Sequence, residues 1–306
     1  MKVAVVGASG MVGQEILAIL SRYDVTVYAI GNRSAGSFVI VNGQSVAIQH
    51  LNDFDFNDVD GVLVSAGSEC AQQVVSKVGK AWVIDNSTAF RMHRGVSLVV
   101  PEIFTGKPSS IIASPNCIAI PVSLVIAPIL QLTSVVEIWG STYQSISGAG
   151  QKSLTLLNEK KGIFNHVQSG IGAINEQGIS EEEEKITFEV QKILSLRCPV
   201  DIMSVRVPIM HGHSVHLKVS LKNQLSLSAI LEKLRSCPYI KLYDNSRPPS
   251  PLDVRSSHQV HVGRVRVREN VLDLWVVSDN LYRGAAWNVC QISKQYFGLK
   301  EVKTNG

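Results

Sequence analysis

The sequence predicts an α/β protein in which an N-terminal, doubly wound Rossmann-like domain is followed by an α+β domain with a mixed or antiparallel sheet. Three observations support this prediction. The 306 residues suffice for two domains of roughly 150 residues each. Strands and helices alternate over the first third of the chain, which is typical of a parallel sheet. Longer amphipathic strands follow after residue 118 and indicate a second kind of sheet.

The alternation of strands and helices begins at the first residues. Residues 2–6 form a continuous apolar run, as expected for a strand buried on both faces. Isoleucine and leucine side chains at helical spacing predict a helix over 13–23, and a second strand is expected at 25–30. Further strands are expected at 61–65, 81–85, 97–100 and 110–114, with a helix over 69–78. This order predicts a parallel sheet covered by helices on both faces.

The second part of the chain is expected to form a different sheet. Residues 261–268 and 271–277 alternate in polarity and are joined through Glu269-Asn270, which predicts a hairpin. The other strands of this part are expected at 135–145, 202–207 and 215–220, and its helices over 180–194 and 227–234. A final helix is expected over 285–297 and should pack back on the first domain. The predicted domains are 1–118, completed by 281–306, and 119–280.

Composition and charge exclude several classes of protein. Hydrophobic residues make up 45% of the chain and charged residues 18%, which excludes a disordered or fibrous protein. A net charge of +4 does not by itself indicate a nucleic-acid partner. The longest apolar run, 118–132, is interrupted by prolines and falls short of the roughly 20 residues that a membrane span needs. The five cysteines form no CxxC pair, so we expect no disulfide framework, no metal and a cytoplasmic location.

A basic stripe offers a weaker indication of nucleic-acid binding. Arg264, Arg266 and Arg268 alternate along one predicted strand and could bind a polyanion. No aromatic residues are interleaved with them, as single-stranded nucleic acid would require. An exposed or interfacial strand face is therefore the simpler interpretation, and we expect no nucleic-acid partner.

A glycine-rich turn follows the first predicted strand. Gly7-Ala-Ser-Gly10-Met-Val-Gly13 opens the first helix, where glycines let the backbone approach a pyrophosphate and the helix N-terminus offers free N–H groups. The alternative is a tight turn without a ligand. No acidic residue ends the second strand, whereas Arg33 and Ser34 are suited to a ribose 2′-phosphate. This favours NADP over NAD, unless Arg33 is only a solvated loop cation.

One cysteine lies where a nucleophile is expected. Cys117 follows Ser114-Pro-Asn and precedes an apolar helix, and a helix N-terminus favours the thiolate. A single cysteine is by itself more often a small core residue, so an acid–base partner is needed. His213 and His211 both lie in a predicted loop between two strands, and either could take up the thiol proton.

The sequence resembles the aspartate-β-semialdehyde dehydrogenase family nearly from end to end. The segments that carry the resemblance are GASGMVGQE at the N-terminus, NRSAG after the second strand, IDNSTAFRM at 84–92, VVPEI at 99–103, SPNC at 114–117, QSISGAG at 144–150, EExK at 182–185, RVPIMHGHS at 206–214, VGRVR at 262–266 and SDNLYRGAAWN at 278–288. So many segments in the family's order make a chance match very improbable.

The resemblance implies roles for particular residues. The family's nucleophile falls on Cys117, its acid–base histidine on His213 rather than His211, and the glutamine that orients the acyl group on Gln144. Groups implied to bind the substrate are Arg206 for the carboxylate, Glu182 for the amine, and Arg91, Asn116 and Lys185 for the phosphate. The cofactor contacts map to Gly7, Ser9, Gly10, Met11, Val12, Gly13, Arg33, Ser34, Ser147, Gly148 and Gln291.

The resemblance also implies the reaction and the assembly. The family reduces L-4-aspartyl phosphate with NADPH to L-aspartate 4-semialdehyde and phosphate, reversibly, in lysine, diaminopimelate, methionine and threonine biosynthesis. Its members are homodimers or homotetramers, so 119–280 would serve catalysis and dimerisation. The sequence departs from the family's pattern at Phe104, Gln151 and Val215. The alternatives are an N-acetyl-glutamyl-phosphate reductase and a non-catalytic dinucleotide-binding sensor.

Overall fold

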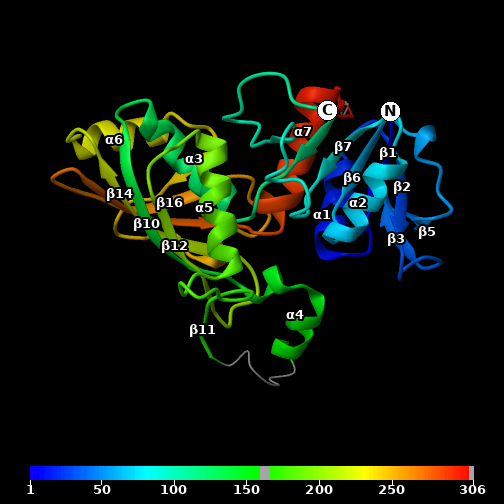
Figure 1. Ribbon diagram of the computed structural model, residues 1–306, viewed down its shortest axis with the longest axis horizontal. Helices are drawn as coiled ribbons and strands as arrows, with labels where there is room; N and C mark the ends of the chain where they lie inside the picture. Colours follow the sequence, from blue (N-terminus) through cyan, green and yellow to red (C-terminus); the bar gives the residue numbers. More distant parts are fainter. Residues whose placement is uncertain (159–165, 303–306) are drawn as a thin grey trace. The chain divides into compact units, whose positions relative to one another are not determined.

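The computed structural model describes residues 1–158 and 166–302 (Figure 1). The chain divides into two compact units, Met1–Pro115 with Ala285–Gly306, and Asn116–Gly284. Residues 303–306, the end of the predicted segment 281–306, lie outside the described residues. The predicted domain boundaries, taken as limits of independently folding domains, stay a prediction.

The first unit contains a seven-stranded sheet in which every neighbouring pair is parallel. In spatial order its strands are β5 (Gln49–His50), β2 (Thr26–Gly31), β1 (Lys2–Val6), β6 (Gly61–Val64), β7 (Trp82–Asp85), β9 (Ile111–Ala113) and β8 (Ser97–Leu98). The helices are α1 (Met11–Leu20), α2 (Ser68–Lys77) and α7 (Trp287–Phe297). This confirms the predicted doubly wound, Rossmann-like fold.

Helices cover both faces of this sheet. Ala4 and Val6 of β1 pack in one cluster with Ala71 and Val74 of α2. Because side chains alternate along a strand, the fully buried Val3 and Val5 face the opposite side. On the C-terminal segment, α7 contacts α1 and β7 within the same unit. The ring of Trp82 on β7 stacks on that of Phe297 at the end of α7, with centroids 4.4 Å apart.

A short hairpin of the first unit was not expected. It consists of β3 (Phe38–Val41) and β4 (Gln44–Ala47), which pair antiparallel. The turn between them is Asn42-Gly43, and both residues have positive φ. Asn-Gly is the residue pair that favours a two-residue hairpin turn, so the sequence did contain the signal.

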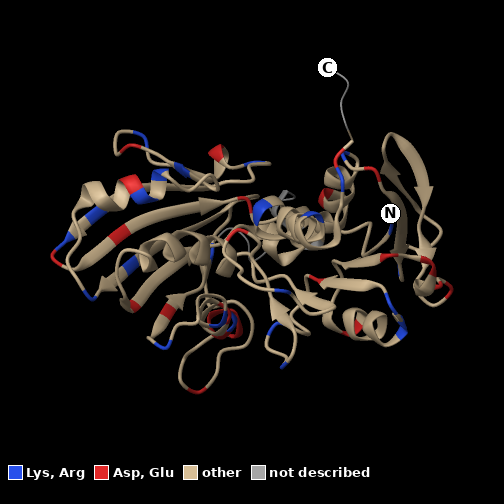
Figure 2. Cartoon of the chain, turned by 90° about the horizontal axis from the view of Figure 1, so that it is seen from above, with Lys and Arg blue, Asp and Glu red and all other residues tan. Residues whose placement is uncertain are grey.

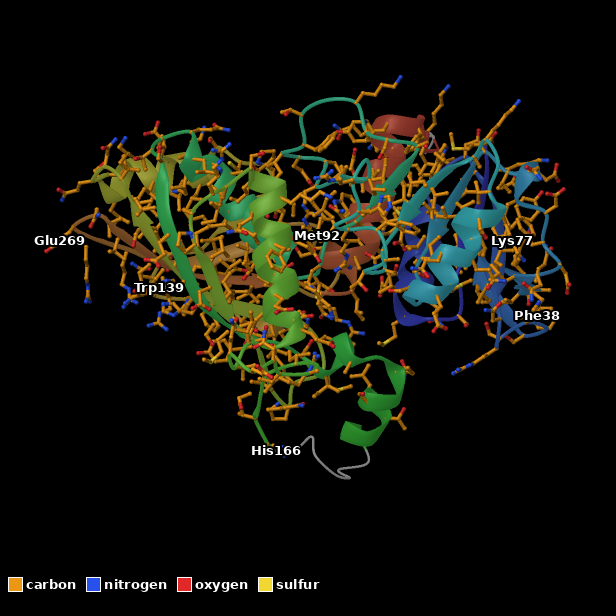
Figure 3. All side chains as sticks on the ribbon, viewed as in Figure 1. Phe38, Lys77, Met92, Trp139, His166 and Glu269 are labelled. Carbon is orange, nitrogen blue, oxygen red and sulfur yellow. The ribbon has the colours of Figure 1, made fainter. Side chains whose placement is uncertain are left out.

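The second unit contains a six-stranded mixed sheet, as predicted. In spatial order its strands are β12 (Val200–Met203), β10 (Val135–Tyr143), β14 (His213–Leu221), β17 (Val271–Ser278), β16 (Val260–Arg268) and β15 (Ile240–Leu242). The outer pairs β10–β12 and β15–β16 are parallel and the inner pairs antiparallel. The predicted hairpin is β16–β17, and Glu269, with φ of 54°, lies at its tip (Figure 3).

One face of the mixed sheet is covered and the other is open. The helix α3 (Ala119–Leu130) contacts both α5 (Glu181–Leu194) and α6 (Leu227–Arg235), and all three helices contact the sheet (Figure 1). Ile138 and Ile202 are fully buried, whereas the alternating Trp139, labelled in Figure 3, and Met203 are more than half exposed. An apolar surface therefore remains on the face that the helices leave uncovered.

The smaller elements of the second unit lie around the ends of these strands. They are α4 (Gln151–Asn158), β11 (Gln168–Ser169) and β13 (Val205–Arg206), of which β11 and β13 pair antiparallel. Figure 2 shows basic and acidic residues interspersed along both units. Within residues 1–158 and 166–302, no helix combines the length and the apolar character needed to cross a bilayer.

Candidate active site

Cys117 lies in the turn between β9 and α3. The Asn116 side-chain oxygen Oδ1 accepts the backbone N–H of Ile118 at 2.7 Å, and the Asn116 carbonyl accepts the N–H of Ile120 at 3.0 Å. These bonds place Cys117 at the N-terminal end of α3. The positive end of the helix dipole stabilises a thiolate at this position.

Two glutamates on α5 hold this turn in place. Glu189, only 1% exposed, accepts the backbone N–H of Asn116 at 2.5 Å. Glu182 accepts the side-chain Nδ2–H of Asn116 at 2.9 Å. The two glutamates are two helical turns apart and therefore share one face of α5. The residue before Cys117 is thus fixed through both its backbone and its side chain.

A glycine allows another segment to approach Cys117 closely. Gly284 lies in a π-helical turn, Tyr282–Ala286, that precedes α7. A Cβ atom at Gly284 would lie 2.9 Å from the Cys117 Cβ and 3.1 Å from its Cα. Any side chain here would therefore displace Cys117, and π-helical turns of this kind are frequent at functional sites.

His213 lies in a strand, not in the loop that the sequence predicted. It is the first residue of β14, and it pairs with Ser278 of β17. The strand that was expected from Val215 begins two residues earlier, because Ser214 pairs with Tyr143 of β10 and His213 pairs with Ser278 of β17. The side chain is 1% exposed and points into the unit rather than into solvent.

The environment of His213 favours a neutral ring. Burial and, to a lesser extent, the positive charge of Arg206 together lower its pKa to about 3, although a hydrogen bond with the Gly212 backbone acts in the opposite direction. The Nδ1 atom accepts the backbone N–H of Ser145 at 3.0 Å. The Nε2 atom has no hydrogen-bond partner among the described residues, so it is the ring nitrogen available to a ligand.

Arg206 lies close to both His213 and Cys117. It lies on β13, is 7% exposed, and donates from Nη1 to the Ser145 carbonyl at 2.7 Å. Burial lowers its pKa, while Cys117 and Glu182 act to raise it. A Cβ atom at Gly148 would lie 2.8 Å from Arg206 Nη1 and 3.2 Å from His213 Nε2. The absence of a side chain at Gly148 therefore keeps the space beside both groups open.

Gln144 completes the cluster of the second unit. It is 1% exposed, and its Nε2 atom lies 3.3 Å from Thr142 Oγ1 and 3.5 Å from Glu182 Oε1. Contacts and electrostatic interactions thus connect Cys117, Asn116, Gln144, Glu182, Arg206 and His213. A thiol, a neutral imidazole and a buried cation lie together, a combination of groups that is suited to acyl transfer.

The first unit contains a separate cavity of about 760 Å³ around the glycine-rich turn. Its lining residues are Val6, Gly7, Ser9, Gly10, Gly31, Asn32, Arg33, Ser34, Ser65, Ala66, Gly67, Ser68, Glu69, Cys70 and Gln73. Gly7 has φ of 82°, and a Cβ atom there would lie 2.7 Å from the Ser65 carbonyl oxygen. The two turns that follow β1 and β6 therefore approach closely through backbone atoms, and the Ser65 hydroxyl donates to the Val6 carbonyl at 3.2 Å.

Comparison with known proteins identifies the family. The model of the semialdehyde dehydrogenase NAD binding domain matches residues 2–110, and that of the semialdehyde dehydrogenase dimerisation domain matches 126–283. Aspartate-semialdehyde dehydrogenases of Rickettsia bellii and Bacillus subtilis are each 34% identical, over 96% and 98% of both chains. The chain belongs to the aspartate-semialdehyde dehydrogenase family. This confirms the resemblance and the enzyme class that the sequence predicted.

A solved structure of this aspartate-semialdehyde dehydrogenase family agrees in fold. Aspartate semialdehyde dehydrogenase II from Vibrio cholerae, complexed with ASA, is 29% identical, with a TM-score of 0.89 over 96% of this chain and 97% of that chain. Agreement over both units confirms the predicted combination of a parallel and a mixed sheet.

The cavity fits the nicotinamide dinucleotide that the NAD binding domain of this family implies. The helices α1 and α2 both begin at this cavity, after Gly10 and Gly67, and neither has a side-chain cap. Their first backbone N–H groups are therefore available to phosphate oxygens. Arg33 and Ser34 follow β2 on the lining, where a ribose 2′-phosphate would need a cation and a hydroxyl.

Some predicted cofactor residues lie at this cavity and others do not. Gly7, Ser9, Gly10, Arg33 and Ser34 line it. Met11, Val12 and Gly13 belong to α1 and are not among the lining residues, and a Cβ at Gly13 would lie 2.2 Å from the Gly7 carbonyl oxygen. Gly13 therefore allows the helix to pack on the turn. Gln291 lies on α7, near Tyr23. Ser147 and Gly148 belong to the second unit.

Two predicted phosphate ligands have hydrogen-bond or ion-pair partners of their own. Arg91 belongs to the first unit, where its Nε and Nη2 atoms donate to the carbonyls of Ser114 and Asn86 at 3.0 and 2.9 Å. Lys185 lies on α5 with its ammonium 3.9 Å from a Glu181 carboxylate oxygen, and it is partly exposed. Both side chains are cationic, and their role toward phosphate stays a prediction.

Sequence reasoning missed several residues of both sites. At the cavity it missed the turn Ser65-Ala-Gly67-Ser68, although this turn repeats the strand–turn–helix pattern that was used at Gly7. Near Cys117 it missed Glu189 and Gly284, and near His213 it missed Ser145 and Asn280. Gly284 and Asn280 lie within the family segment SDNLYRGAAWN, which was a signal without an assigned role.

Proposed function

We propose that this protein is an aspartate-semialdehyde dehydrogenase. It reduces L-4-aspartyl phosphate with NADPH to L-aspartate 4-semialdehyde and phosphate, reversibly, and so supplies lysine, diaminopimelate, methionine and threonine biosynthesis. The observation that carries the proposal is the position of Cys117 at the start of α3, with Arg206 interacting electrostatically with both Cys117 and the buried His213. Membership of the family supports the choice of substrate.

Cys117 forms a covalent bond with the substrate in this proposal. The thiolate attacks the acyl carbon of aspartyl phosphate, the carbon–oxygen bond to phosphate breaks, and phosphate leaves with the electron pair. A thioester remains on Cys117, so that one difficult step becomes two easier ones. Arg91, Asn116 and Lys185 stabilise the charge of the leaving phosphate.

The second half of the reaction reduces the thioester. When NADPH is bound, its nicotinamide ring supplies the hydride. His213 gives a proton from Nε2 to the oxygen of the reduced thioester and takes it back as the carbon–sulfur bond breaks. Backbone N–H groups at the start of α3 stabilise the transient oxyanion.

The remaining residues of the cluster orient the substrate. Arg206 binds the α-carboxylate through two of its N–H groups, a geometry that lysine cannot reproduce. Glu182 pairs with the amine, and Gln144 directs the acyl group.

The alternation of exposed Trp139 and Met203 with buried neighbours supports a homodimer or homotetramer built on the open sheet face, and the dimerisation-domain match supports a dimer. Five free cysteines are consistent with a cytoplasmic location.

Reduction of NADP in the reverse direction tests the function. The purified protein is given aspartate semialdehyde and NADP, with and without inorganic phosphate, and NADPH absorbance is followed. Turnover that requires phosphate is expected. Equal or faster turnover with N-acetyl-glutamate semialdehyde would favour the alternative reductase, and no turnover with either aldehyde would favour a non-catalytic sensor.

A further inference from the structure

A fully buried hydrogen-bond network surrounds His213 on the side away from Nε2. The Ser145 hydroxyl lies 3.1 Å from His213 Nδ1 and donates to Asn280 Oδ1 at 3.2 Å. Asn280 Nδ2 donates to Ser147 Oγ at 2.9 Å, and the two serine hydroxyls are 3.0 Å apart. None of these side chains is more than 2% exposed.

The orientation of the Asn280 amide is fixed by its surroundings. Its Oδ1 atom accepts the backbone N–H of Gly212 at 3.0 Å, which an NH₂ group could not do. Asn280 therefore always presents an acceptor toward Ser145. The Ser145 hydroxyl can turn its hydrogen either to His213 Nδ1 or to Asn280 Oδ1, because a hydroxyl both donates and accepts.

If Nε2 of His213 is to act as a general acid, Nδ1 of the same ring must also carry a proton. A neutral ring with its only proton on Nε2 cannot give that proton away without becoming an imidazolate, so an acid at Nε2 must also have a proton on Nδ1. The backbone N–H of Ser145 points at Nδ1 and opposes this second proton. The Ser145 hydroxyl is a side-chain group within hydrogen-bond distance of Nδ1 that can accept this proton, and the Gly212 backbone also favours the protonated ring.

We propose that Ser145 and Asn280 are positioning residues that let His213 carry a proton on Nδ1 during turnover. During turnover Nδ1 keeps a proton and donates it in a hydrogen bond to Ser145 Oγ, whose own hydrogen turns to Asn280 Oδ1. Nε2 is then a base in the neutral ring and an acid in the imidazolium, and the one proton that moves enters and leaves at Nε2. The other neutral tautomer, with its proton on Nε2, instead accepts the backbone N–H of Ser145 at Nδ1 and exchanges with the working tautomer through solvent protons. The inference rests on the proposed acid–base function of His213.

The charged groups near His213 make such a device necessary. The positive charge of Arg206 lowers the pKa of His213 and so disfavours the protonated ring. Cys117 and Glu182 interact with Arg206 and offset part of its charge. Uncharged Ser145 and Asn280 stabilise the imidazolium through hydrogen bonds without holding it permanently charged, as a carboxylate at position 280 would.

The first test removes the Ser145 hydroxyl. In Ser145→Ala, kcat should fall about 10- to 100-fold, because a hydrogen bond to a charged group is lost. The KM values for aspartate semialdehyde and NADP should stay within about twofold, since neither ligand is bound by this hydroxyl. The matched control is Ser278→Ala, a buried serine opposite His213 whose hydroxyl has no hydrogen-bond partner within the described part of the chain. Its kcat should equal that of the wild type.

The second test places a charge on the network. Asn280→Asp keeps the acceptor for Ser145 and should raise the pKa of His213 by about one unit, because a nearby negative charge favours the imidazolium. The shift is read from the pH profile of kcat and from ¹⁵N titration of the His213 ring, assigned with His213→Asn. In the double variant Ser145→Ala/Asn280→Asp, less than half of this shift should remain, because the hydroxyl that transmits it is gone.

Two results would overturn the proposal. One is wild-type kcat and pH profile in a folded Ser145→Ala variant. The other is an unchanged His213 pKa in Asn280→Asp, or the same increase with and without the Ser145 hydroxyl. The ring titration needs no substrate, so it decides the role of the network even if the wild-type protein reduces no NADP, which would instead refute the proposed function.

Discussion

The two sites of this protein are built in different ways. The cavity of the first unit is made from two strand–turn–helix segments, and its closest approaches join backbone atoms at Gly7 and Gly13. The cluster of the second unit joins side chains from the start of α3, from α5, from β13 and from the first residue of β14. The first site therefore depends on glycines that leave no room for a side chain, whereas the second depends on the chemical identity of its side chains. Substitutions in the two units should therefore have separable effects.

The largest effect is expected at the nucleophile. Cys117→Ala should lower kcat by more than about 10⁴-fold, because no other group can form the thioester. Binding of NADPH, measured by fluorescence titration, should be unchanged, since the cavity lies in the first unit. If Cys117→Ala weakened NADPH binding, substitutions in the two units would not have separable effects on catalysis and cofactor binding. Residual turnover near the wild-type rate would show that the cysteine has no covalent role.

A smaller loss is expected at the acid–base group. His213→Asn should lower kcat by about 10²- to 10⁴-fold, the range that general acid–base catalysis contributes. The KM for the aldehyde should change little, because Nε2 acts on protons and not on the substrate carboxylate. A loss confined to KM would instead make His213 a binding residue.

A substitution in the first unit should weaken cofactor binding and leave catalysis unchanged. Arg33→Ala should weaken NADP binding about tenfold, as expected for loss of an exposed charge-assisted hydrogen bond, and leave NAD binding nearly unchanged. At saturating NADP, kcat should match that of the wild type. If the preference for NADP over NAD survives, Arg33 does not contact the 2′-phosphate.

The smallest effect concerns stability in acid. Burial lowers the pKa of His261 to about 4, and its ring nitrogens lie 3.2 Å from Tyr243 Oη and 2.9 Å from Ser257 Oγ. Between the unfolded pKa and this value the unfolded chain binds a proton that the native state does not, so stability falls as pH falls. From pH 7 to pH 5 this residue should account for a loss of about 2 kcal/mol in the free energy of unfolding.

Urea unfolding measures this dependence. In His261→Asn the stability should be lower at pH 7 but should change less between pH 7 and pH 5, since a titratable group has been removed. An unchanged pH dependence would mean that other groups, with His213 the first candidate, produce the acid sensitivity.

The parts of the molecule that depend on neighbouring residues could be predicted from the sequence. The turn at Gly7, the parallel strands and the Glu269-Asn270 hairpin each follow from a few consecutive residues. The Asn42-Gly43 hairpin had an equally local signal that was overlooked. His213 was expected in a loop between the strand ending at Pro208 and the strand from Val215, but pairing with Ser278 of β17 extends the strand back to this residue.

The parts that depend on distant residues could not be predicted by pattern alone. Ser145 and Asn280 are 135 residues apart in sequence, and Asn116 and Glu189 are 73 apart. No periodicity or spacing reports such contacts. Family resemblance located Cys117 and His213, but it assigned no role to Glu189, Ser145 or Asn280, which hold them. The structure adds the hydrogen bonds that orient these two residues.

A mass measurement of the acyl-enzyme tests the central claim most directly. The protein is mixed with aspartate semialdehyde and NADP without phosphate, quenched in acid, and examined by intact-mass spectrometry and peptide mapping. The account predicts one added aspartyl group on the peptide that contains Cys117, and its loss when phosphate is added before quenching. NADPH formation with an unmodified Cys117, or with the added mass on another residue, would contradict it.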